Sequence, residues 1–298
     1  MTGNYRKQVE ILLDVLPMVA QENCFAMHGG TAINLFVRNM PRLSVDIDLT
    51  YCLVEERSVS LFHINEALER LQKKIEKVLG LFVQHQQDTY KLIVSNQKAQ
   101  IKIEVNPVGR GVISGTQKMV LCEKAQEEFD RFVELNVVST GQLYGGKICA
   151  ALDRQHPRDL FDIKYLFLND GFTEEIKKGF LYHLLSSSSP IHELLMPPLF
   201  DQRKTFENQF DGMSLEPFTY ADFENTRQLL LDVIQEKLTF QDRKFLLSVK
   251  NLEPDWSIYD FKEFPSIKWK LQNLEKLSLD NPAKYLDQTE QLKIKLNI

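Results

Sequence analysis

Residues 29–49 of the chain read GGTAINLFVRNMPRLSVDIDL. From Leu43 to Tyr51 apolar and polar side chains alternate, which predicts a half-buried strand. Asp46 and Asp48 stand two residues apart on this strand, so both carboxylates are expected on one face, about 7 Å apart along the backbone. Two carboxylates so placed can converge on one or two divalent cations. The alternative is the polar edge of a half-exposed strand, since short motif matches are common.

The glycine pair upstream of this strand predicts a tight turn that leads into a helix. Gly29 and Gly30 precede Thr31, where a helix is expected to start, and Pro41 lies past its end. Glycine allows the backbone to approach a phosphate closely, and a helix N-terminus offers free N–H donors. The alternative is an ordinary turn. The position just before the strand favours a phosphate-binding loop made by Gly29, Gly30 and Thr31.

A third carboxylate is predicted on a later strand. Lys102 and Glu104 alternate with the apolar residues Ile101, Ile103 and Val105. Glu104 could therefore complete a metal site or serve as the general base for an incoming hydroxyl group. The alternative is a surface ion pair between Lys102 and Glu104.

The rest of the chain predicts an α/β (α+β) fold. A small mixed sheet flanked by helices is expected in residues 1–136, and a mostly helical part in residues 137–298. Ser139 or Thr140 could cap one helix and Pro157 could open another. We expect further helices over 5–22, 61–79, 139–152 and 157–168, and further strands over 89–95 and 99–106.

Composition is that of a folded protein with no predicted membrane segment. Of the 298 residues, 43% are hydrophobic and 26% are charged. No stretch reaches the roughly 18 apolar residues that a membrane helix needs, and the polar N-terminus does not resemble a signal peptide. The cysteines have no CxxC spacing and are expected to be buried free thiols, which fits a reducing cytoplasm; they are Cys24, Cys52, Cys122 and Cys149.

Several enzyme classes have no support in the sequence. It contains no GxSxG, HExxH or GxxxxGK[ST] pattern, so neither a serine hydrolase nor a P-loop enzyme is indicated. The net charge of −5 gives no overall attraction to nucleic acid. An RNA partner would need a local basic patch, which we predict from Lys147, Arg154, Arg158 and Lys164.

The order of the motifs resembles a known signature. A Gly-Gly-Thr turn, then Asp46-Ile47-Asp48, then a Glu104 flanked by apolar residues is similar to the DNA polymerase beta-like nucleotidyltransferase superfamily. The segments GGTAINLF and RLSVDIDL, with GGKICAALDRQHPRDLFDIKYL at Gly145–Leu166, more narrowly resemble the AbiEii/AbiGii toxin family. These are the toxins of type IV toxin–antitoxin and phage-abortive-infection systems and include the MenT enzymes. The resemblance covers about residues 25–170.

The resemblance implies further site residues. In the family a helical lysine and an aspartate of an RDL.D segment complete the site, which here implies Lys147, Arg158, Asp159 and, as an additional candidate, Asp162. Lys147 would neutralise a triphosphate. Its helix is expected to begin near Gly145-Gly146, where the missing side chains would admit a nucleotide. The alternatives are a solvated helix lysine and acidic residues that cap the first turn of a helix.

The implied function is a metal-dependent nucleotidyltransferase toxin. It would use Mg²⁺, or Mn²⁺, to transfer a nucleoside monophosphate from a nucleoside triphosphate to the 3′ end of tRNA, and an antitoxin protein would restrain it. Ser44, placed on the face of Asp46 and Asp48, would lie at the nucleotide, and some family members are silenced by phosphorylation of a serine in this position. The alternatives are nucleotidylation of a protein or a small molecule, such as an antibiotic, or a nucleotide-binding regulator without turnover.

Overall fold

The computed structural model describes residues 3–298 and divides into two compact units. The first contains the chain up to Ser139 together with Glu207–Phe218, and the second contains Thr140–Phe206 together with Thr219–Ile298. These units are defined by their internal contacts. The predicted division into domains of residues 1–136 and 137–298 stays a prediction.

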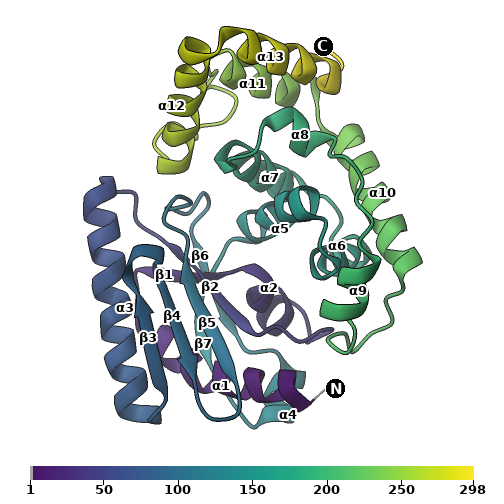
Figure 1. Cartoon of the computed structure of the whole chain (residues 1–298). Coiled ribbons are helices and arrows are strands. Elements are labelled where there is room, and N and C mark those ends of the chain that lie inside the picture. Colours follow the sequence, from purple (N-terminus) through teal and green to yellow (C-terminus); the bar gives the residue numbers. More distant parts are fainter. Residues whose placement is uncertain (1–2) are drawn as a thin grey trace. The chain divides into compact units, whose positions relative to one another are not determined.

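The first unit is built on a seven-stranded mixed sheet, as predicted (Figure 1). The strand order is β3-β4-β5-β2-β1-β7-β6. β2 runs parallel to β5 and β1 parallel to β7, whereas the other neighbours are antiparallel. The strands are β1 (Phe25–His28), β2 (Asp46–Tyr51), β3 (Phe82–Gln86), β4 (Lys91–Ser95), β5 (Gln100–Val105), β6 (Thr116–Val120) and β7 (Glu134–Val138).

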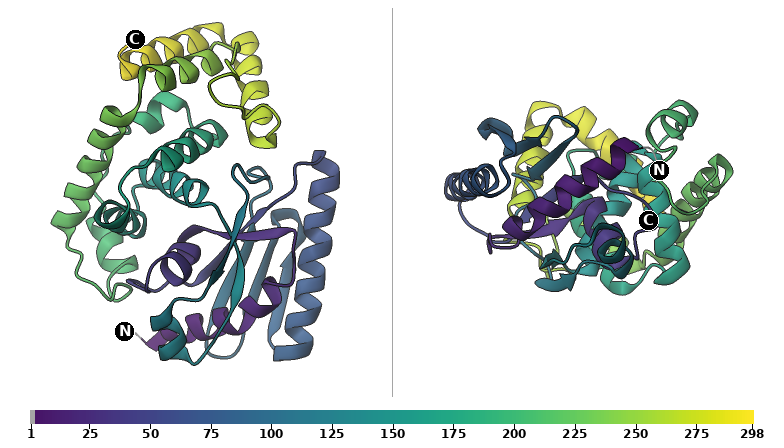
Figure 2. Two further views of the ribbon diagram at one scale, coloured as in Figure 1. Left: turned by 180° about the vertical axis from the view of Figure 1, so that it is seen from behind. Right: turned by 90° about the horizontal axis from the view of Figure 1, so that it is seen from below.

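Two amphipathic helices pack on this sheet. α1 (Gly3–Val19) contacts β5, β7 and α3 (Arg57–Leu79), and α3 contacts β3 and β4. Figure 2 (left) shows α1 crossing the face of the sheet that is turned away in Figure 1. α3 ends where predicted, because Gly80 adopts the left-handed conformation with a φ of 63°. The short helix α4 (Glu123–Phe129) precedes β7.

The glycine pair starts a helix two residues earlier than predicted. α2 (Gly29–Ala32) begins directly after β1 and continues as a wider π-helical turn over Ile33–Val37. The strand predicted to start at Leu43 starts at Asp46. The cause is tertiary pairing, because the amide of Leu43 donates to the carbonyl of Met213 at 2.9 Å.

This pairing holds the segment Glu207–Phe218 in the first unit. The Leu215 amide donates to the Pro41 carbonyl at 2.9 Å, and Arg42 forms an antiparallel bridge with Ser214. A stretch that lies far along the sequence is therefore fixed beside the residues that lead into β2.

The described residues of the second unit form helices and loops without a strand. α5 begins at Thr140 and α6 at Pro157, as predicted. The helices are α5 (Thr140–Arg154), α6 (Pro157–Asn169), α7 (Glu174–Ser186), α8 (Ile191–Leu195), α10 (Tyr220–Lys237), α11 (Phe240–Lys250), α12 (Pro265–Asp280) and α13 (Pro282–Leu296); α9 (Arg203–Gln209) leads out of the unit. Over residues 3–298, no helix is long and apolar enough to cross a membrane.

α5 and α7 approach so closely that their backbones touch at glycines. A Cβ atom on Gly145 would overlap the backbone of Gly179, and one on Gly179 would overlap the backbone of Gly141. The space beside Gly145 is thus filled by α7. The prediction that Gly145 admits a nucleotide is therefore wrong. Of the two helix starts predicted from the sequence, Thr140 is correct and Gly145-Gly146 is not.

Candidate active site

The carboxylates of β2 share one face of the sheet. Asp46 and Asp48 are half-buried and alternate with Ile47, which is fully buried. In the parallel pairing of β2 with β5, Asp48 lies opposite Glu104 and Asp46 lies opposite Lys102. Residues opposite each other in neighbouring strands point to the same side. The strand placement therefore puts all three carboxylates on the polar face, as the alternation predicted.

Glu104 is held by two lysines. Its carboxylate lies 2.9 Å from the ammonium of Lys102 and 3.0 Å from that of Lys91. Burial by itself would raise the pKa of Glu104, but the hydrogen bonds from Lys102 and Lys91 outweigh it and leave the pKa below its ordinary value. The ion pair between Lys102 and Glu104, which was the predicted alternative, is thus also present. Glu104 lies beside Asp48 and is held there by two lysines.

The pKa of Lys102 is also affected by Asp46 and Asp48. Burial would lower the pKa of Lys102, but its bond to Glu104 and the nearby charges of Asp46 and Asp48 raise it above the ordinary value. Three carboxylates lie on this face beside the ammonium groups of Lys91 and Lys102, and the buried guanidinium of Arg42 lies next to Gly30. Carboxylate oxygens are the protein ligands that a hard divalent cation prefers.

The donor set on β2 fits a magnesium ion that is shared with phosphates. Among the described residues, no group of three His, Cys, Asp or Glu side chains is placed to hold a metal by itself. Mg²⁺ commonly takes only one or two carboxylates and completes its shell with water and substrate phosphate oxygens. Asp46 and Asp48 match that requirement, whereas Glu104 would have to exchange a lysine contact to become a third ligand.

Gly29 is fitted against the second aspartate. Its φ of 73° favours glycine, and a Cβ atom at this position would overlap the carboxylate of Asp48. At Gly30, a Cβ atom would lie 2.7 Å from the Arg42 guanidinium and 3.2 Å from the Ser44 hydroxyl. The glycine pair therefore allows the start of α2 to approach the polar face of β2 closely.

Thr31 and Ser44 are buried and tie α2 to β2. The Thr31 hydroxyl is hydrogen-bonded to the main-chain carbonyl of Asp46 and to the Ser44 hydroxyl, with 2.9 Å between the two hydroxyl oxygens. Ser44 is 7% exposed and precedes the strand. The predicted strand position of Ser44 is therefore wrong, although its hydroxyl is hydrogen-bonded to Thr31, which in turn binds the main-chain carbonyl of Asp46.

A second group of charged residues joins α5 and α6; Lys147, Asp159 and Asp162 are buried, and the exposed Arg154 closes the group from the solvent side. The Lys147 ammonium lies 3.0 Å from Asp159 and 3.0 Å from Asp162. Arg154 binds Asp159 from the other side through Nε at 2.6 Å and Nη2 at 3.0 Å. Two cations balance two carboxylates, so the cluster is neutral. Lys147 is only 6% exposed, and the alternative of a solvated helix lysine is therefore wrong.

The pKa of Asp159 reflects this pairing. Burial would raise it, but the charges and hydrogen bonds of Lys147 and Arg154 hold the pKa well below its ordinary value. Arg154 was predicted as part of a basic patch and not as a partner of Asp159. The spacing of seven residues from Lys147 to Arg154, two helical turns, could have indicated a shared face.

The predicted basic patch of four residues is largely neutralised. Lys147 and Arg154 serve the buried cluster, and Lys164 pairs with Asp222 at 2.9 Å. Lys147 is buried and so lies outside any surface patch, whereas Arg154 and Lys164 keep exposed surface, and for them the patch stays a prediction. Arg158 is half-buried at the start of α6, where its main-chain N–H donates to the His156 ring at 3.1 Å.

Comparisons with known proteins identify the family. A family model described as nucleotidyl transferase AbiEii toxin, type IV TA system, matches residues 10–273. MenT4, a nucleotidyltransferase toxin from Mycobacterium tuberculosis H37Rv, shares the fold with a TM-score of 0.59 and 13% sequence identity, over 89% of this chain and 92% of that chain. No curated protein sequence matches. Because the family model spans most of the chain, the protein belongs to the AbiEii family, the nucleotidyltransferase toxins of type IV toxin–antitoxin systems.

Proposed function

We propose that this toxin transfers a nucleoside monophosphate from a nucleoside triphosphate to the 3′ end of tRNA, in a reaction that requires Mg²⁺ or Mn²⁺. The observation that supports the metal requirement is the alignment of Asp46, Asp48 and Glu104 on one face of the sheet. A type IV system pairs its toxin with an antitoxin. By the same proposal an antitoxin protein restrains this chain in the cytoplasm.

The acidic residues have distinct proposed roles. Asp46 and Asp48 hold the metal, which when bound neutralises phosphate charge and favours ionisation of the attacking hydroxyl group. Glu104 accepts the proton of that hydroxyl as general base or serves as a third ligand. Lys102, which balances the carboxylates, exchanges its contact with Glu104 when a divalent cation arrives.

The remaining residues bind and orient the nucleotide in this proposal. Gly29, Gly30 and Thr31 bring free amides at the start of α2 close to the carboxylates, where phosphate oxygens can be cradled. Arg158 and Lys147 neutralise the triphosphate. Asp159 acts as a positioning residue, since it fixes the Lys147 ammonium at 3.0 Å.

The acceptor is tested with the full chain, each of the four α-³²P-labelled nucleoside triphosphates in turn, and total RNA. We expect label on tRNA with Mg²⁺ and none with EDTA. Loss of the label after removal of the 3′-terminal nucleotide would locate it at the 3′ end. If a protein or a small molecule in a whole-cell extract becomes labelled instead, that molecule and not tRNA is the acceptor. Nucleotide binding without transfer to any fraction would indicate a regulator.

Ser44 is predicted to tolerate loss of its hydroxyl far better than gain of charge. In Ser44→Glu a carboxylate would stand in a buried place beside Asp46, where it repels phosphate, so transfer should fall by more than about tenfold. Ser44→Ala loses only a hydrogen bond to Thr31 and should stay within about threefold of wild type. The measurement is the initial transfer rate of both variants, with circular dichroism to verify folding. Near-normal transfer by folded Ser44→Glu protein would show that Ser44 does not lie close to the bound nucleotide.

A further inference from the structure

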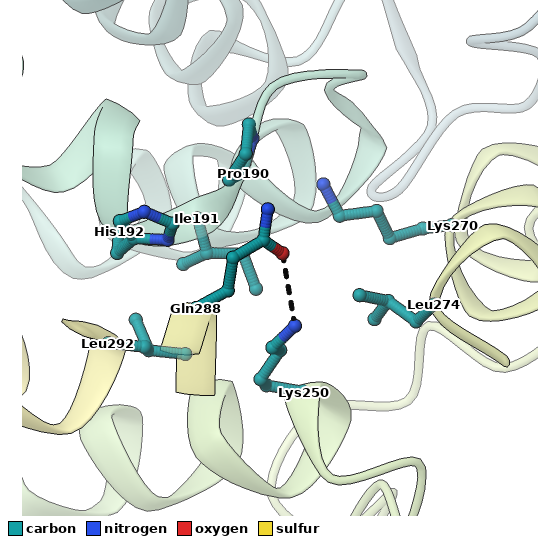
Figure 3. A pocket seen from close by; sticks show the side chains of 8 residues that line it. All are labelled: Pro190, Ile191, His192, Lys250, Lys270, Leu274, Gln288 and Leu292. Atoms are coloured by element: carbon teal, nitrogen blue, oxygen red, sulfur yellow. Dashed lines mark hydrogen bonds between the residues drawn. The ribbon is translucent and has the colours of Figure 1, made fainter. Parts of the chain in front are cut away.

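A small pocket lies among α8, α11, α12 and α13 of the helical unit (Figure 3). Lys250 reaches it from α11 and Lys270 from α12, and the Gln288 amide enters it from α13. The other lining residues are Pro190, Ile191, His192, Leu274 and Leu292. Lys250 is 3% exposed and Lys270 is 5% exposed, so both ammonium groups have left bulk water.

Neutral groups hold these two ammonium groups. Lys270 donates to the carbonyl oxygens of Ser187 and Ser189 at 2.9 and 2.8 Å. Lys250 donates to the side-chain carbonyl of Gln288 at 3.2 Å and lies over the Tyr285 ring, 4.2 Å from its centroid. In the described part of the chain, no carboxylate lies within ion-pair distance of either lysine.

The other buried lysines of the same unit show the opposite pattern. Lys147 contacts Asp159 and Asp162, and Lys177 contacts Glu174 and Asp242. Burying a charge without an opposite charge is costly. Lys147 and Lys177 each have two carboxylate partners that offset this cost. Lys250 and Lys270 in the pocket have none within ion-pair distance among the described residues.

The electrostatics agree with this geometry. Burial lowers the pKa of Lys250 to about 8, and burial together with the charge of Lys250 lowers the pKa of Lys270 to about 8. At neutral pH both lysines therefore carry most of their positive charge. The surrounding titratable groups are Cys149 and Asp153 on α5, His192 and Glu193 on α8, and Tyr285, Asp287 and Lys295 on α13.

We propose that this pocket binds one phosphate group between Lys250, Lys270 and Gln288. An ammonium has three donors, so Lys270 keeps one and Lys250 keeps two beyond their present hydrogen bonds, and the Gln288 amide adds N–H donors. The room for water-sized groups in the pocket is about 20 Å³, so only one small ligand group can enter it. That group is either free inorganic phosphate or the terminal phosphate of a larger molecule.

The test is calorimetric titration of the full chain with inorganic phosphate at pH 7.5 and constant ionic strength. We expect saturable binding to wild type and at least tenfold weaker binding to Lys270→Met and to Lys250→Met. Lys268→Met is the matched control on α12, since that lysine is exposed and pairs with Glu263 at 2.8 Å. It should bind phosphate as wild type does. Lys270→Arg, which keeps the charge, should recover part of the affinity.

Two further arms sharpen the result. Asp48→Asn, which alters the proposed metal site, should bind phosphate normally, so failure of the proposed function would not affect this outcome. Methyl phosphate that binds more tightly than inorganic phosphate would indicate a terminal phosphate as the ligand, and the reverse order would indicate the free ion. Binding should take up protons and weaken above about pH 8, as the lysines lose charge. Absence of phosphate binding to wild type, or equal affinity in folded Lys270→Met and Lys250→Met, would overturn the proposal.

Discussion

Asp48→Asn is expected to lower nucleotidyl transfer about a thousandfold while the protein remains folded. The amide keeps the shape of the side chain and its position opposite Glu104, but it removes the negative charge that a divalent cation needs. A loss of about 4 kcal/mol of transition-state stabilisation corresponds to that factor. The measurements are the transfer rate at saturating Mg²⁺ and the affinity for Mn²⁺ followed by electron paramagnetic resonance.

The control for Asp48 is an exposed aspartate in the same unit that lies outside the strands. Asp88→Asn changes an exposed residue of the short 3₁₀ turn Gln87–Thr89 and should leave both transfer and Mn²⁺ binding unchanged. Asp46→Asn should behave as Asp48→Asn does. Full transfer by folded Asp48→Asn protein would refute the metal assignment on β2.

Lys147→Met is expected to destabilise the protein by about 3–5 kcal/mol, the usual effect of breaking a buried ion pair from one side. The methionine fills a similar volume, but the cluster of Lys147, Arg154, Asp159 and Asp162 would change from neutral to negative in a buried place. The measurement is the free energy of unfolding in urea. Lys164→Met, which breaks the more exposed pair with Asp222, should cost about 1 kcal/mol or less.

A double variant separates the structural role of Lys147 from its proposed nucleotide contact. Lys147→Met combined with Asp162→Asn removes one charge of each sign and restores neutrality, so much of the lost stability should return. If Lys147 neutralises the triphosphate, transfer stays low in this stable protein. Recovery of transfer together with stability would show that Lys147 only holds α5 and α6 together.

The elements that the sequence predicted well are those with long, regular patterns. Helix α3 has a buried apolar stripe and a left-handed glycine at its end, and α6 has proline in its first turn. β5 alternates without interruption. In each case the local residue preference and the tertiary burial favour the same structure, so a single sequence was enough to predict the element. The face shared by Asp46, Asp48 and Glu104 followed from the same alternation.

The missed elements depend on contacts between distant residues. β6 exposes nearly all of its side chains at the edge of the sheet, and β3, the other edge strand, buries one side chain well, so neither carries a clear periodic pattern. The strand begins at Asp46 and not at Leu43, because the Leu43 amide pairs with the Met213 carbonyl. Likewise, the partner of Lys164 is Asp222, which the sequence places 58 residues away. No local rule gives such pairs.

Because Glu207–Phe218 belongs to the first unit, the two units cannot be separated by cutting the gene at one position. A gene fragment that stops after Ser139 encodes every strand of the sheet, yet it lacks the residues that pair with Pro41–Leu43. Each unit consists of two separate stretches of sequence, so a single crossover between two related genes cannot exchange one whole unit. We therefore expect a stable chimera to need Glu207–Phe218 from the same protein as Pro41–Leu43, with which this segment pairs.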